Sequence, residues 1–343
     1  MTNYLITYFI LMLCFFISIK KKDKIDSNIP SDTNVLRGLI CIIILLLHTF
    51  QNVEYNKCYI IINCIGVMCN GFFFFISGYG VEKKYLQDSN YINSFPINRF
   101  FKVLIPYIII NVFYIIYYHF IGIDVSFKMV IEQIMIGLPI VKYSWFITNL
   151  FLFYLAFWLL HKKFSNNNIA IVSSLIIIFI FYSICCMELN YIYYWIYSFN
   201  HLAIIGMIWA IMEKKIIKML KKYSSFVLLF SIIEVIFFII CSYLIGRENI
   251  PFIIGILISG NFLTLIFIIL LYKYSFSNIL FKFLGKISME IYLFHGLFIL
   301  IYRYIINNDI LFILLVLLST IVTSTIFHSC YSLVLKAKKS VGG

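Results

Sequence analysis

Long apolar runs separated by short polar segments repeat along almost the whole sequence. The runs are roughly 16 to 26 residues long, close to the length that an α-helix needs to cross the hydrocarbon core of a bilayer. The pattern predicts an all-α, polytopic membrane helix bundle of about eleven transmembrane helices. The predicted spans are residues 4–19, 35–50, 59–79, 103–123, 143–160, 169–186, 191–212, 226–245, 252–272, 287–306 and 310–335.

The composition excludes an ordinary soluble domain. Apolar residues make up 63% of the 343 residues, charged residues make up only 12%, and the mean hydropathy is +1.00. A soluble domain carries about a quarter charged residues. Most of the nine cysteines lie inside apolar runs without zinc-ligand spacing. We interpret them as packing residues, and no metal site is predicted.

The distribution of the basic residues predicts an orientation in the membrane. The chain has a net charge of +13, and most of its Lys and Arg residues lie in the odd-numbered loops, for example at 20–24 and 214–222. By the positive-inside rule these loops are cytoplasmic, which places the N-terminus outside and the C-terminus in the cytoplasm. The basic excess is therefore a topology signal directed at the lipid bilayer, and no nucleic-acid partner is predicted.

We predict one membrane domain without an appended soluble module. It spans residues 34–336, after an extra N-terminal transmembrane helix and basic cytoplasmic loop at 1–33 and before a short cytoplasmic tail at 337–343. The first run lacks the basic region and cleavage site of a signal peptide. Heavy use of Ile, Asn and Lys indicates an AT-rich coding sequence, which favours a multi-pass protein of the bacterial cytoplasmic membrane.

The second span carries two polar residues at a helical spacing. His48 follows Arg37 by eleven residues, close to three turns, so both side chains share one helix face about 16 Å apart along the axis. Ionisable residues inside a span are costly and are functional candidates by default. The alternative is a hydrogen-bonded core histidine with an ordinary interfacial arginine.

A second polar stripe lies in the tenth span. Tyr292 and His295 follow Ser288 at offsets of four and seven, which places all three residues on one helix face. A polar contact between helices would need the same pattern. Glu234 lies in the middle of the eighth span. It could orient a histidine by accepting its second N–H, or it could bond a neighbouring helix.

Arg99 and Lys102 precede Pro106 at the entry to the fourth span. Together with Arg37 they predict a basic cluster that faces the cytoplasm. The alternative is a plain topology signal that contacts anionic lipid.

These residues carry a resemblance to the membrane acyltransferase-3 family, the bacterial O-acyltransferases that act on cell-surface carbohydrates. The resemblance covers about residues 34–335, and its motifs occur in order along the chain. They are Arg37-Gly38 with His48, the aromatic-Ser-Gly segment at 72–79, Arg99 with Lys102, Ser144-Trp145-Phe146 with Tyr154, Gly206-Met207, and Leu284-Gly285 with Ser288, Tyr292 and His295. Lys102 stands where the family pattern has an arginine, which weakens the expectation of a bidentate grip on phosphate there.

The resemblance implies an O-acyltransferase, with acetyl-CoA or another acyl-CoA as a donor substrate and no permanently bound cofactor. Arg37, Arg99 and Lys102 would hold the CoA phosphates, and the acceptor would be a hydroxyl of a cell-surface carbohydrate or its precursor. His48 would act as a general base or carry the acyl group briefly, with His295 and Glu234 as further catalytic candidates. Ser77, Ser288, Tyr292 and Trp145 would support the site, with Ser77 or Tyr292 as a donor to the oxyanion.

A second function class fits the same architecture. A transporter or flippase for a lipid-linked sugar would also have many helices and polar residues near the midplane. Against it, the sequence shows no inverted repeat and no paired helices interrupted by Gly or Pro. A scaffold without catalysis would leave the buried histidines unexplained. The acceptor, the acyl group, the oligomeric state and the role of the first helix stay open.

Overall fold

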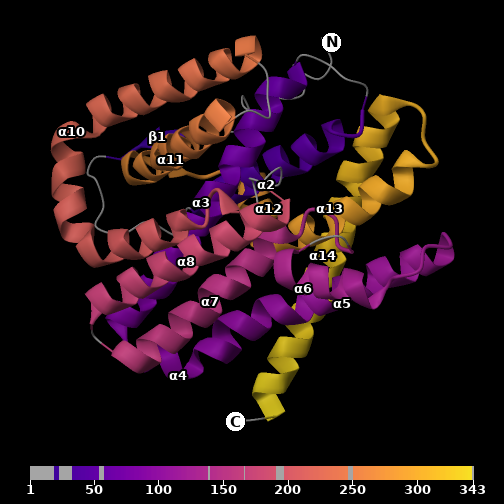
Figure 1. Ribbon diagram of the computed structural model, residues 1–343, viewed down its shortest axis with the longest axis horizontal. Coiled ribbons are helices and arrows are strands. Elements are labelled where there is room, and N and C mark those ends of the chain that lie inside the picture. The colour runs from indigo at the N-terminus through magenta and orange to yellow at the C-terminus, as the bar shows by residue number, and fades with distance from the viewer. Residues whose placement is uncertain are drawn as a thin grey trace.

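The computed structural model describes residues 19–22, 33–53, 58–137, 140–165, 167–190, 197–245 and 250–341. Helices dominate the described part of the chain (Figure 1). The elements in order are β1 (Ile19–Lys21), α2 (Thr33–Phe50), α3 (Cys58–Gln87), α4 (Tyr91–Phe95), the π-helical turn η1 (Pro96–Phe100), α5 (Phe101–Phe120), α6 (Phe127–Ile136), α7 (Trp145–Phe164), α8 (Asn168–Asn190), α10 (His201–Ile245), α11 (Ile250–Lys273), β2 (Tyr274–Phe276), α12 (Ile279–Lys286), α13 (Ser288–Arg303) and α14 (Asp309–Val341).

The prediction of a multi-pass membrane bundle is confirmed. Within the described ranges, eight helices are long and apolar enough to cross a membrane, and the pair α12 and α13, bent by 77° at Ile287, forms a possible ninth, broken span. The first predicted span, 4–19, lies outside the described residues except for Ile19, and the start of the seventh lies outside them as well. The count of eleven and the orientation of the termini therefore stay predictions.

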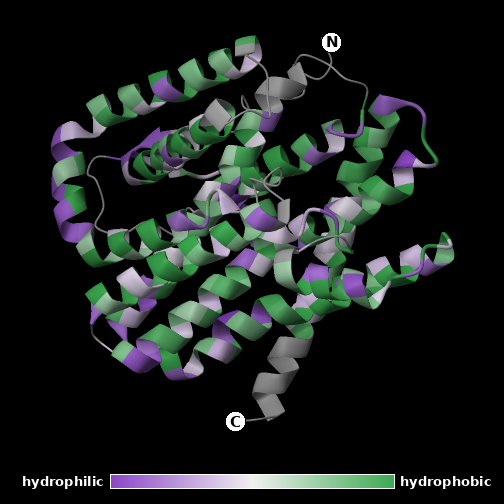
Figure 2. Ribbon diagram, viewed as in Figure 1, coloured by the Kyte–Doolittle hydropathy of each residue, from purple (hydrophilic) through white to green (hydrophobic). Residues whose placement is uncertain are grey.

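The structure corrects two of the predicted boundaries. The basic segment 213–225, expected to be a loop between two spans, is helical and joins them into the single helix α10. Figure 1 shows α10 turning back on itself at the left edge, where Figure 2 shows hydrophilic residues. Lysine is a good helix former, so a Lys-rich segment can continue a helix as easily as end it. The fourth span is also longer than predicted, because α4, η1 and α5 together cover Tyr91–Phe120 and include Arg99 and Lys102.

Several predicted cytoplasmic loops lie at one end of the bundle. β1, in the first loop, pairs antiparallel with β2, in the ninth, with Lys20 opposite Ser275. Lys83 of α3 forms an ion pair with Glu213 of α10, which joins the predicted third and seventh loops. This grouping is what alternating loops require.

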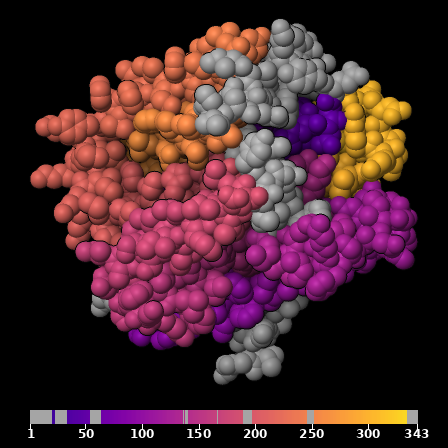
Figure 3. Space-filling view, in the orientation of Figure 1, coloured from indigo at the N-terminus to yellow at the C-terminus, as the bar shows by residue number. Residues whose placement is uncertain are grey.

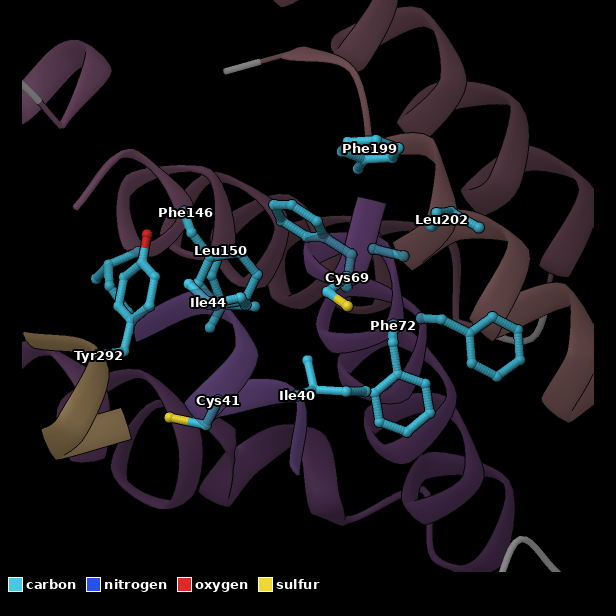
Figure 4. Packing of buried hydrophobic residues seen from close by; sticks show 14 of the residues in the cluster. Ile40, Cys41, Ile44, Cys69, Phe72, Phe146, Leu150, Phe199, Leu202 and Tyr292 are labelled. Atoms are coloured by element: carbon cyan, nitrogen blue, oxygen red, sulfur yellow. The ribbon is translucent and has the colours of Figure 1, made fainter. Parts of the chain in front are cut away.

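Helix α2 forms the centre of the bundle. Nearly all its residues are buried, and it contacts α3, α12, α13 and α14. In Figure 4, Cys41 and Ile44 lie toward Phe146 and Tyr292, whereas Ile40 lies toward Phe72 of α3. On the face seen in Figure 3, the indigo residues of α2 occupy only a small patch, whereas purple residues further along the chain reach the lower edge. A helix that is apolar over most of its circumference is expected in such a position.

The peripheral helices expose large apolar side chains instead. Phe120 of α5 is 81% exposed, Ile169 of α8 is 84% exposed and Leu244 of α10 is 73% exposed. Figure 2 shows hydrophobic residues over most of α8 and over the last part of α10. Such extended apolar surface is suited to lipid and is unusual on a soluble monomer.

Two pairs of glycines let the central helices approach each other at backbone distance. A methyl group placed on Gly38 of α2 would clash with the carbonyl oxygen of Phe281, and one on Gly285 of α12 would clash with that of Asn34. Gly78 of α3 and Gly206 of α10 form the corresponding close approach between α3 and α10. Small residues at helix crossings allow this packing in membranes.

Gly78→Ala is expected to destabilise the protein by about 1–3 kcal/mol, the usual cost of overpacking. The added methyl group would meet backbone atoms of Ala203, which cannot rotate away. Thermal unfolding of the purified protein in detergent measures the effect. Gly80→Ala is the matched control in the same helix, because its methyl group would have Arg99 Nη2 at 4.0 Å as its nearest neighbour. Equal unfolding temperatures for the two variants would contradict the packing argument.

Candidate active site

A cavity of about 430 Å³ lies among α2, α3, α5, α7, α13 and α14. Its volume falls within the range of small-molecule sites, roughly 300–1,000 Å³. Among the described residues that line it, Glu290 is the one carboxylate, and four carry a Lys or Arg charge: Arg37, Arg99, Lys102 and Lys286. The cavity is therefore suited to an anionic ligand, and it brings together the three residues of the predicted basic cluster.

Arg37 is held in the cavity wall from two sides. Its Nη2 donates to Ser288 Oγ at 3.1 Å and its Nη1 donates to Asn34 Oδ1 at 3.4 Å. The close crossing of Gly38 and Gly285 places the first turn of α2 beside this end of α13. Arg37 Nε is buried without a hydrogen-bond partner among the described residues. A buried donor without a partner is costly, so this atom marks a position where a ligand acceptor would stabilise the site.

Arg99 and Lys102 approach the same cavity from η1 and the start of α5. Arg99 Nε donates to Tyr91 Oη at 3.0 Å, so its guanidinium has a fixed position. Lys102 is exposed, which places its ammonium at the rim of the cavity. The cluster thus combines two hydrogen-bonded arginines with the point charge of an exposed lysine.

Three of the predicted supporting residues line the cavity and one does not. Ser77, Ser288 and Tyr292 are lining residues. Ser77 Oγ donates to Phe73 O at 2.8 Å within its own helix, which leaves its lone pairs as the groups available to a ligand. Trp145 is buried at the start of α7, with its ring 6.5 Å from that of Phe74, and does not line the cavity.

His48 and His295 lie side by side, as a shared site requires. Their ring centroids are 5.2 Å apart, although the two residues come from α2 and α13. His48 Nδ1 is 3.1 Å from Gln51 Oε1, and His295 Nδ1 is 2.7 Å from Tyr292 O. Both partners are acceptors, so each Nδ1 carries a proton and each Nε2 is left as a base. His295 Nε2 is buried without a partner in the part of the chain that the structure describes.

Tyr292 stands between the cavity and the histidine pair. It lines the cavity, and its ring centroid is 5.7 Å from that of His295. Its hydroxyl donates to the carbonyl oxygen of Tyr143. Figure 4 shows Tyr292 beside Phe146 and Ile44 at this point. The basic cavity and the two imidazoles are therefore adjacent compartments of one site.

The structure does not bring Glu234 to this site. Its Oε1 accepts a hydrogen bond from Ser259 Oγ of α11 at 2.8 Å, and it does not line the cavity. The hydrogen bonds of the two histidines go to Gln51 and Tyr292 instead. The prediction that Glu234 orients a histidine is replaced by its alternative, a bond to a neighbouring helix.

Two further site residues were not predicted. Glu290 lines the cavity, and its Oε1 is 2.7 Å from His328 Nδ1. An acidic residue inside an apolar span, two positions after Ser288, was the sequence feature that could have pointed to it. Tyr143 stacks on His48 with ring centroids 3.8 Å apart. No sequence signal marks it. Beside it, burial lowers the pKa of the Lys142 ammonium.

A polytopic helical membrane protein with a basic cavity next to two buried imidazole bases has the parts of a group-transfer enzyme of the membrane. The model of the acyltransferase-3 family, described as an acyltransferase domain, matches residues 32–329. The chain belongs to this family and is an acyltransferase. No curated protein and no solved structure gives a significant match.

Proposed function

We propose that the protein is an O-acyltransferase of the bacterial cytoplasmic membrane. It moves an acyl group, such as acetyl, from cytoplasmic acyl-CoA to a hydroxyl of a cell-surface carbohydrate or its precursor. The observation that carries the proposal is the arrangement along α2. Arg37 lines the basic cavity, His48 lies beyond it, and their offset of eleven residues spans about 16 Å along the helix, which suits an extended pantetheine arm.

The basic side chains would bind the phosphates of the donor. Charge-assisted hydrogen bonds from guanidinium to phosphate are short and strong, and Arg37 and Arg99 are already held in place by Ser288 and Tyr91. Lys102 and Lys286 add positive charge at the cavity. The thioester would then extend past Tyr292 toward the histidines.

The chemistry follows from the protonation of the imidazoles. His48 Nε2 takes the proton of the acceptor hydroxyl as the oxygen forms a bond to the thioester carbonyl carbon. The carbon–sulfur bond then breaks, and the departing CoA sulfur takes the proton from His48, so the base is restored. His295 Nε2, a buried acceptor without a partner in the described structure, would hold the acceptor hydroxyl or the protonated imidazole of His48.

Labelled acetyl-CoA tests the proposal. Membranes from the producing organism, and the purified protein in vesicles, are incubated with acetyl-CoA labelled in the acetyl group. We expect CoA release and alkali-labile label in the carbohydrate fraction. Movement of a lipid-linked sugar across the vesicle membrane without any acetyl transfer would instead support the flippase.

Arg37→Ala is expected to raise KM for acetyl-CoA by about ten- to a hundredfold, because hydrogen bonds to charged groups contribute about 1.5–3 kcal/mol. Lys102→Ala should have a smaller effect, since its side chain is exposed. Initial rates over a range of acetyl-CoA concentrations measure both. An unchanged KM for Arg37→Ala would remove Arg37 from the donor site.

A further inference from the structure

The backbone of Tyr143 is strained in the loop before α7. Its φ is +68°, a conformation that a bulky residue seldom adopts. Such strain persists only where surrounding contacts impose it, and it gathers at functional sites. The residue is therefore held in place for the position of its side chain.

The surrounding contacts that hold this loop come from α13 and from α6 with its C-terminal Gly137. Tyr292 of α13 donates to the carbonyl oxygen of Tyr143 itself. Next to it, Ser144 Oγ donates to Gly137 O at 2.9 Å and accepts from Gln133 Nε2 of α6 at 2.7 Å. Gln133 Oε1 also accepts from the backbone N–H of Val141 at 3.0 Å.

The loop packs directly on the helix that carries His295. A methyl group placed on Gly296 would lie 2.9 Å from the carbonyl oxygen of Lys142 and 2.5 Å from Tyr114 Oη. Glycine is the residue that leaves room for this approach. The loop position is thus coupled to the histidine pair through the backbone of α13.

The ring that this backbone positions covers His48. The two rings are 3.8 Å apart and inclined by only 19°, so Tyr143 lies over one face of the imidazole. The Tyr143 ring is also 5.4 Å from that of His295. Asn52 Nδ2 donates to Tyr143 Oη at 3.4 Å, and Gln51, the partner of His48 Nδ1, is exposed.

These groups lie at the end of α2 opposite to the basic cavity. Arg37 is in the first turns of α2, whereas Gln51 and Asn52 follow its last residue, Phe50. An aromatic ring beside amide side chains suits a sugar, because the ring packs on C–H groups and the amides both donate to and accept from hydroxyls. An acceptor that approached from here would meet His48 without crossing the donor cavity.

We propose that Tyr143 is a positioning residue of the acceptor side, which shields His48 from water and, with Gln51 and Asn52, forms the rim on which a carbohydrate hydroxyl is presented. This inference rests on the proposed function. It assigns donor and acceptor to opposite ends of α2, with the histidine pair between them.

Chemical accessibility of His48 tests the shielding without any enzyme activity. The wild type, Tyr143→Ala and Tyr143→Phe in vesicles are treated with diethyl pyrocarbonate, and the carbethoxylation of His48 is followed by peptide mass spectrometry. We expect several-fold faster modification in Tyr143→Ala and a wild-type rate in Tyr143→Phe. Tyr302→Ala is the control, because it removes a tyrosine from another part of α13, where the Tyr302 hydroxyl contacts Ser319 Oγ of α14. Tyr143→Gly, whose backbone suits a positive φ, replaces the alanine variant if that one does not fold.

Release of free CoA from acetyl-CoA without added carbohydrate gives the second readout, with water as the acceptor. Several-fold faster release by Tyr143→Ala, with KM for acetyl-CoA unchanged, supports the inference. Equal His48 modification in the folded wild type and Tyr143→Ala would overturn it. If the wild type neither releases CoA nor transfers acetyl groups, the proposed function fails, and the modification rates still decide whether Tyr143 covers His48.

Discussion

Replacing His48 by alanine is expected to lower the rate of acyl transfer by about 10²- to 10⁴-fold, the contribution of a well-placed general base. Its Nε2 is free to take the hydroxyl proton because Nδ1 is directed to Gln51 Oε1. The loss should fall on kcat, because the basic side chains proposed to bind phosphate line the cavity at the other end of α2. Initial rates with labelled acetyl-CoA measure the loss, and the binding affinity for CoA should be unchanged.

His201→Ala is the matched control for this experiment. His201 is also in a transmembrane helix and contacts a polar partner, Asn261 Oδ1 at 2.8 Å, but it does not line the cavity. A folded His201→Ala protein should transfer acetyl groups at close to the wild-type rate. If folded His48→Ala retains more than a tenth of the wild-type rate, His48 is not the base.

Local helix geometry explains which parts of the site could be predicted from the sequence. Arg37 and His48 share one helix, as do Ser288, Tyr292 and His295, so the periodicity of a helix fixes their relative positions. The grouping of Arg37 with Arg99 and Lys102 came from the alternation of the loops. In the structure these three residues line one cavity, and the two histidines lie side by side.

Contacts between helices explain what could not be predicted. Glu234 has the same local pattern as a histidine-orienting carboxylate, and only the packing of α10 on α11 gives it Ser259 as its partner. The positive φ of Tyr143 arises from contacts with α6 and α13, which no local pattern encodes. The bend at Ile287 likewise depends on how α12 packs across α2.

The glycines of the family motifs also separate what the sequence predicts from what only contacts between helices reveal. Gly38, Gly78, Gly206 and Gly285 were noticed in the sequence only as parts of a resemblance. In the structure they are paired at two helix crossings, where the partner backbone leaves no room for a methyl group. These crossings hold α2 against α12 and α3 against α10, and so position Arg37, Ser77 and Ser288 around the cavity.

His161→Ala is expected to lower the free energy of unfolding by about 3–5 kcal/mol, because it leaves Glu82 buried without its partner. Both side chains are almost fully inaccessible, at 0% and 1%. His161 Nε2 is 3.2 Å from Glu82 Oε2, and His161 Nδ1 donates to Phe157 O at 2.9 Å. The other carboxyl oxygen, Oε1, has no partner among the described residues.

A double variant separates the free-energy cost of leaving the Glu82 carboxyl without a partner from the cost of lost packing. Glu82→Leu combined with His161→Leu removes both polar groups, and it should recover most of the stability that His161→Ala loses, because a well-packed apolar pair can replace a buried ionic one. Lys128→Ala, which removes an exposed pair with Glu132, should leave the unfolding temperature unchanged. Equal losses in the double variant and in His161→Ala would show that packing, and not the buried carboxyl, sets the cost.

The pair joins α3 to α7, which carry Ser77 and Phe146 of the cavity wall, so a large loss in His161→Ala should also weaken donor binding.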